Sequence, residues 1–154
     1  MKTATRIETI LFQMQAFAGT SHVLTDMLNN IRIEYQMEED SVEIVKDMDR
    51  AQLNRIWHAT RAFDTSLRMF LEKFAAVPAG AHSIGAYVIA LQNRSSARTF
   101  KKLSRMTAGN IDDEVTKKRN KYAHSSNAIP TKAEADFVIS RILQYTTEVY
   151  KLEI

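Results

Sequence analysis

The chain has 154 residues, of which 45% are hydrophobic and 25% charged, a composition ordinary for one globular domain that can bury a core. The absence of cysteine excludes disulfides, thiolate catalysis and cysteine-bound zinc. The net charge of +3 is modest, and no apolar run approaches the roughly 18 residues that a membrane span needs.

The first two predicted helices occupy the N-terminal part of the chain. Apolar residues at helical spacing indicate a helix over roughly 4–18, which ends at Gly19, and a second over roughly 21–36. The acidic stretch 37–48 is expected to be a loop or a short exposed helical piece. Glu8, Gln13 and Gln15 interrupt the apolar segment of a signal peptide, so we expect a cytoplasmic protein.

The third predicted helix is the longest. Asp49 is a good N-cap with Gln52 in the third helical position, and the apolar stripe then continues until Pro78 and Gly80 end it. Trp57 lies on this stripe and is expected to anchor the core, whereas His58 projects off it toward the surface.

The remaining helices are shorter until the last. We expect one near 83–93 and one near 96–107, the latter capped by Ser95 or Ser96. Asn110 is expected to cap the next helix, which has three acidic residues in its first turn. After a loop over 125–130, Thr131 and Glu134 form a capping box for the final helix. Four glycines and two prolines agree with this all-α fold, a single domain over 1–154 built as an up-and-down helical bundle with extra short helices.

Charge is distributed unevenly along the chain. Between Glu34 and Asp49, seven acidic residues accompany one lysine, a local charge of −6. Between Arg94 and Lys121, nine basic residues accompany three acidic ones, a local charge of +6. This asymmetry favours an anionic partner for the later half.

Several common sites can be excluded from the motifs. Gly80 and Gly85 have the spacing of phosphate-loop glycines, but the Lys and Ser/Thr of that loop are missing. The four histidines lie far apart, and none has a second histidine three or four positions away for a helix-borne metal site. No Gly-x-Ser-x-Gly elbow is present. We therefore expect neither a metal nor a cofactor.

The segment from Lys117 to Ser126 is the one that can carry chemistry. When it is projected as a helix, Tyr122 falls on the apolar stripe and is expected in the core, while Asn120 and His124 are neighbours on nearly the opposite face. Arg119 lies on the flank, within reach of both. Arginine suits phosphate oxygens, and histidine exchanges protons near neutral pH. Together they suit RNA cleavage by the 2′-hydroxyl, although solvated polar residues on an exposed helix are the simpler alternative.

This segment resembles the signature of the HEPN superfamily, an Arg followed by a polar residue and then by a His after a gap of four to six residues. Here the signature is Arg119, Asn120 and, after a gap of four, His124. The resemblance covers roughly residues 110–150, where the motif ends a late helix before a capped final one. It implies a HEPN-like bundle and a metal-independent endoribonuclease, with the catalytic motifs of two subunits meeting in a homodimer. It also implies a role as a toxin or a phage-defence effector, with an antitoxin or a larger defence complex as possible partners.

Further residues are expected to support the site. On the predicted helix near 96–107, basic side chains share one face opposite Phe100 and Leu103. They could follow RNA phosphates or be a solvated face. The RNA-binding candidates there and on the motif helix are Arg98, Lys101, Lys102, Arg105, Lys117 and Lys121.

Two charges fall on apolar stripes and need partners. Asp64 lies on the stripe of the long helix and Arg141 on that of the last helix. One interpretation is that they pair with each other in the core. Alternatively, Asp64 orients Arg119 or His124.

Two other functions compete with the ribonuclease. A HEPN-like module could bind a nucleotide or RNA without cutting it. A structural or antitoxin-like interaction protein could use the acidic segment 37–49 to dock a basic partner.

Overall fold

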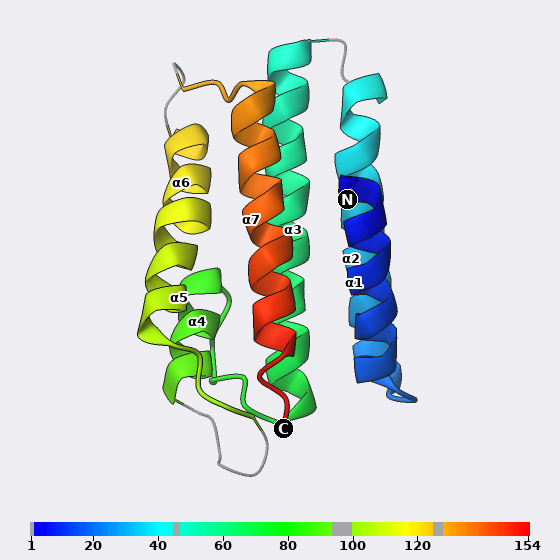
Figure 1. Ribbon diagram of the computed structural model, residues 1–154, viewed down its shortest axis with the longest axis vertical. Helices are drawn as coiled ribbons and strands as arrows, with labels where there is room; N and C mark the ends of the chain where they lie inside the picture. Colours follow the sequence, from blue (N-terminus) through cyan, green and yellow to red (C-terminus); the bar gives the residue numbers. More distant parts are fainter. Residues whose placement is uncertain (1, 45–46, 94–99, 125–127) are drawn as a thin grey trace.

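The computed structural model describes residues 2–44, 47–93, 100–124 and 128–154, apart from the side chains of Met48, Asp49 and His124. Figure 1 shows an all-α bundle, so the predicted fold class is confirmed. The described residues form no strand, only an isolated antiparallel bridge between Phe100 and Glu153. None of the described helices combines the length and the apolar composition needed to cross a membrane.

Helices α1 (Thr3–Ala18) and α2 (His22–Ile44) form the first antiparallel pair. Gly19 ends α1 as predicted, because its φ of +57° is readily adopted only by glycine. Of the two predictions for 37–48, a loop is wrong for 37–44, which are helical and mostly exposed but continue α2 instead of forming a separate piece. Glu38 and Ser41 are buried there, so tertiary contacts extend the helix beyond its apolar stripe.

Helix α3 (Met48–Lys73) is the central long helix, and its ends differ from the prediction. It begins one residue after Asp47, whose side chain accepts a hydrogen bond from the Arg50 N–H at 3.4 Å. The predicted N-cap Asp49 therefore lies inside the first turn.

The end of α3 comes before the predicted Pro78. Ala75 adopts a left-handed φ of +52°, and the Ala76 N–H donates to the Leu71 carbonyl at 2.9 Å. This is the hydrogen bond of a Schellman cap, with alanine in the place that glycine usually takes.

Helix α4 (Ile84–Asn93) agrees with the prediction, but the next predicted helix is wrong for residues 100–104. Phe100 is buried against Phe70 and Phe74, and the Lys101 N–H donates to the Leu152 carbonyl at 2.8 Å. Burial of one aromatic ring thus lays this segment in extended form against the C-terminal residues. The candidate caps Ser95 and Ser96 lie outside the described residues.

Helix α5 (Arg105–Ile111), the π-helical turn η1 (Asp112–Thr116) and α6 (Lys117–His124) follow one another without a break. Ser104 caps α5 by accepting a hydrogen bond from the Thr107 N–H. The predicted helix start at Asn110 is therefore wrong. Ile111 and Val115 are both fully buried, so core packing carries the helix through the acidic residues.

Helix α7 (Lys132–Tyr150) begins with the predicted capping box, in which the Thr131 side chain accepts from the Glu134 N–H and the Glu134 carboxylate accepts from the Thr131 N–H. Val138, Ile142 and Tyr145 point into the core as expected. Phe137 does not, since 41% of it is exposed.

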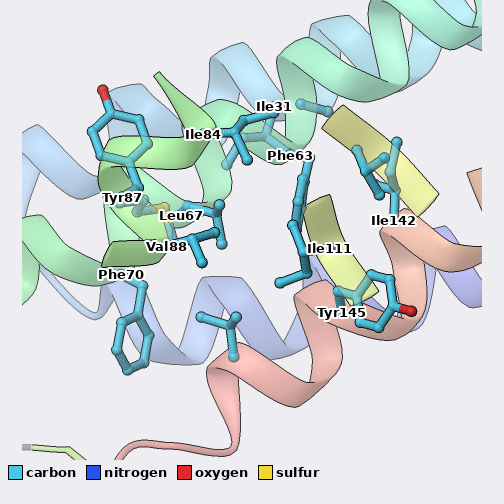
Figure 2. Packing of buried hydrophobic residues seen from close by; sticks show 14 of the residues in the cluster. Ile31, Phe63, Leu67, Phe70, Ile84, Tyr87, Val88, Ile111, Ile142 and Tyr145 are labelled. Atoms are coloured by element: carbon cyan, nitrogen blue, oxygen red, sulfur yellow. The ribbon is translucent and has the colours of Figure 1, made fainter. Parts of the chain in front are cut away.

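In Figure 1, α3 and α7 occupy the centre, α1 and α2 lie on one side, and α4, α5 and α6 lie on the other. Figure 2 shows how side chains from these layers meet in one core, among them Ile31, Phe63, Leu67, Ile111 and Ile142. Trp57, expected in this core, is 37% exposed. The motif helix α6 therefore rests on α3 and α7 with one face toward solvent.

Candidate functional site

The three motif residues lie on α6, close to its C-terminal end. Tyr122 is buried as predicted, so the apolar stripe of this helix faces the bundle. Arg119 and Asn120 are partly exposed. His124 is the last residue of the helix, one turn after Asn120, and its side chain lies outside the described residues.

The Arg119 guanidinium is oriented by its neighbour in the sequence. Its Nη2 and Nε donate to the Asn120 Oδ1 at 2.8 and 3.3 Å. Within the part of the chain that the structure describes, no carboxylate lies within ion-pair distance of Arg119. The guanidinium is thus held by a neutral amide and retains donors for another anion.

Asp64 is a carboxylate of α3 that interacts electrostatically with Arg119. Its burial raises the pKa of this carboxyl group, while the charges of Arg119 and then Arg68 act to lower it. The sequence left two roles open for Asp64, a core pair with Arg141 or orientation of Arg119 or His124. The electrostatic interaction with Arg119 agrees with the second role.

The predicted core pair of Asp64 with Arg141 is wrong. The Arg141 Nε lies 3.4 Å from the Glu114 Oε2, and its Nη1 donates to the Gln144 Oε1 at 2.8 Å. The buried face of α7 includes Ile139 and Leu143, which the sequence pattern did not indicate, and it leaves Arg141 at its edge.

The lysines of α6 differ in what they contact. Lys117 makes ion pairs with Asp113 at 2.9 Å and Asp112 at 3.4 Å, and these hydrogen bonds raise its pKa. The Lys121 Nζ lies 5.5 Å from the centre of the Tyr122 ring. Both stand within one turn of Arg119, but Lys117 is already partly neutralised.

The other predicted RNA-binding residues are not brought to the motif. Lys101 and Lys102 are exposed on the extended segment, so the predicted helical stripe is wrong for them. Arg105 opens α5, fourteen residues before Arg119, or about 21 Å along the helix axis. Arg98 lies outside the described residues.

Two carboxylates of the acidic stretch from Glu34 to Asp49 are engaged within the protein. Glu38 is buried and pairs with Arg55 at 3.0 Å. Just before it, Glu34 contacts the His58 Nδ1 at 2.8 Å and the Arg61 Nε at 3.0 Å. His58 is accordingly half-buried rather than a surface residue. Other acidic side chains of this segment are exposed, so docking of a basic partner there stays a prediction.

Sequence reasoning missed a small pocket on the Tyr122 face of the motif helix. It lies between α6 and α7, and Lys118, Tyr122, Ala133, Glu134, Phe137 and Val138 line it. The helical period placed Phe137 in the core, so no sequence signal marked this pocket. Arg68, by contrast, stands four residues after Asp64 on α3, a spacing from which its approach could have been expected.

Comparison of the chain with models of known protein families, with curated proteins and with solved structures gave no match. The site is therefore interpreted from its own residues.

Proposed function

We propose that this chain is a metal-independent endoribonuclease of HEPN type, in which RNA is cleaved through attack by its own 2′-hydroxyl. The observation that carries the proposal is the state of Arg119, half-buried, oriented by Asn120 and free of a carboxylate ion pair among the described residues. A guanidinium held in this way can donate to the oxygens of a phosphate.

The reaction requires a base, an acid and stabilisation of the negative charge on the pentacoordinate phosphorus. The base removes the proton of the 2′-hydroxyl, and the 2′-oxygen forms a bond to phosphorus. The bond from phosphorus to the 5′-oxygen breaks, and the acid protonates that oxygen. The products are a 2′,3′-cyclic phosphate and a 5′-hydroxyl.

Each motif residue has a role in this scheme. His124 would exchange the protons, because imidazole is the side chain whose ordinary pKa lies near neutrality. Arg119 would bind the phosphate and stabilise the developing charge. Asn120, whose Oδ1 accepts from Arg119, would present its amide group to the phosphate. Asp64 would hold Arg119 through its charge from α3.

We propose that the active form is a homodimer in which the two motifs meet. One imidazole cannot easily act as base and acid in the same turnover, whereas two chains supply two. Arg119 and Asn120 are partly exposed, so a second chain could reach them. The HEPN resemblance further supports a role as a cytoplasmic toxin or phage-defence effector, restrained by an antitoxin or a larger defence complex.

The test is cleavage of RNA in excess EDTA by the wild type, His124→Ala and Arg119→Ala. Loss of a positioned general acid/base should reduce the rate by roughly 10²–10⁴-fold. His82→Ala and Arg32→Ala are matched controls, since both residues are exposed outside α6. Product analysis should find the 2′,3′-cyclic phosphate.

Equal cleavage by all variants would reject the assignment of the site. Binding of RNA without cleavage by the wild type would favour the non-catalytic RNA-binding module. The absence of both would leave the interaction protein as the surviving alternative.

A further inference from the structure

The pocket between α6 and α7 lies on the Tyr122 face of the motif helix and holds none of the motif residues. Its walls include the rings of Tyr122 and Phe137, with Lys118 and Glu134 among the charged residues. Its volume of about 290 Å³ falls just below the range of about 300–1,000 Å³ typical of pockets for drug-sized ligands. It therefore suits a single small ring system.

Phe137 is held in an unusual position for an aromatic residue of a bundle helix. It is 41% exposed, and the Arg141 guanidinium carbon lies 5.0 Å from the centre of its ring. Arg141 is fixed in turn by Glu114, which extends from the π-helical turn η1. The Phe137 ring is thus partly exposed, with the Arg141 guanidinium over it.

The charges around the pocket indicate what it receives. Lys118 stands next to Arg119 in the sequence, and Lys121 lies beside the Tyr122 ring. The Glu134 carboxylate is engaged by the Tyr122 hydroxyl and by Thr131. An aromatic surface flanked by cations is how proteins bind the bases and backbone of single-stranded nucleic acid.

We propose that this pocket holds one unpaired nucleobase of the RNA, stacked on Phe137, while an adjacent phosphate lies at Arg119. The inference rests on the proposed ribonuclease function and adds a requirement to it. The RNA should be single-stranded at this position, because a base within a duplex must first be unpaired and unstacked, at an energetic cost, before it can enter the pocket.

The test measures the affinity of a short single-stranded RNA of mixed sequence in the His124→Ala background, where the RNA stays intact. Phe137→Leu keeps an apolar side chain but removes the aromatic ring. Loss of one stacked base should weaken binding by about 5- to 150-fold. Phe12→Leu is the matched control, since Phe12 is 78% exposed on α1.

The same strand annealed to its complement distinguishes stacking from other effects. Phe137→Leu should bind this duplex as the parent does, and its circular dichroism and thermal unfolding should be unchanged. Unchanged affinity for the single strand would overturn the base pocket and leave the ribonuclease proposal standing. Equal losses on both RNAs would also overturn it. No binding of either RNA by the parent would reject the ribonuclease proposal and the pocket together.

Discussion

Arg55 and Arg119 are both partly or fully buried arginines, but their surroundings differ. Arg55 donates to Glu38, Gln52 and Asp136 at 3.0, 2.8 and 2.7 Å, so each of its three nitrogens has a partner. It ties α2, α3 and α7 together. Arg119 directs two nitrogens to one amide oxygen on its own helix.

This difference separates a structural arginine from a candidate functional one. Two of the partners of Arg55 are carboxylates, which neutralise its charge and compensate the cost of burying it. Arg119 is oriented without being neutralised, which leaves its charge available at a partly exposed surface. The comparison predicts that changes at Arg55 reduce stability and changes at Arg119 reduce activity.

The largest effect is expected for Arg55→Met. It would leave Glu38, whose side chain is only 6% exposed, without its ion-pair partner. Breaking a buried pair in this way should lower the free energy of unfolding by about 3–5 kcal/mol, measured by urea denaturation. Arg61→Met is the control. The Arg61 side chain is 69% exposed in its pair with Glu34. Loss of this pair should therefore lower the free energy of unfolding by about 1 kcal/mol or less.

The next effect is expected for Arg119→Lys, which keeps the charge but loses the planar fork of donors. Removal of a donor from a developing oxyanion typically lowers kcat by about 10²–10³-fold. Urea denaturation should find nearly the wild-type stability. A large loss of stability with normal cleavage would make Arg119 a structural residue like Arg55.

A smaller effect on cleavage, at most about 10²-fold, is expected for Asp64→Asn, which removes the α3 carboxylate that interacts electrostatically with Arg119. Stability should change in the opposite direction. Burial raises the pKa of Asp64 in the folded protein. At pH values above this pKa the carboxyl group is ionised, and its buried charge lowers the stability of the folded state. The variant should therefore be at least as stable as the wild type at neutral pH. This advantage should disappear as the pH falls and the wild-type carboxyl group is protonated, which thermal unfolding across pH would measure.

The smallest effect is expected on the salt dependence of RNA binding, when lysines of α6 with and without a carboxylate partner are compared. Each phosphate contact contributes about 0.7 to the dependence of log affinity on log salt for single-stranded RNA. Lys121→Ala should reduce this slope by about that amount. Lys117→Ala should reduce it less, because Asp112 and Asp113 already neutralise Lys117. Equal reductions would indicate that these ion pairs open when RNA binds.

Helices, several of their ends and the core face of α6 could be predicted from the sequence. Gly19, the capping box at Thr131 and the burial of Tyr122 follow from signals that act within one or two turns. The motif was found in the same way, because its residues are neighbours on one helix. The extended segment at Phe100 and the unbroken helix through Asn110 were missed, since in both cases core packing overrides the local signal.

The sequence by itself determined that this is a helical protein with Arg119, Asn120 and His124 on one helix. Only the tertiary structure decided which charges meet. The charge of Arg119 acts on Asp64, Arg141 pairs with Glu114, and Glu38 is enclosed with Arg55. Phe137 is left at the surface beside a pocket. The reason is that helical periodicity fixes the relative directions of side chains on one helix, whereas the rotation and offset between helices are set by how their apolar faces pack.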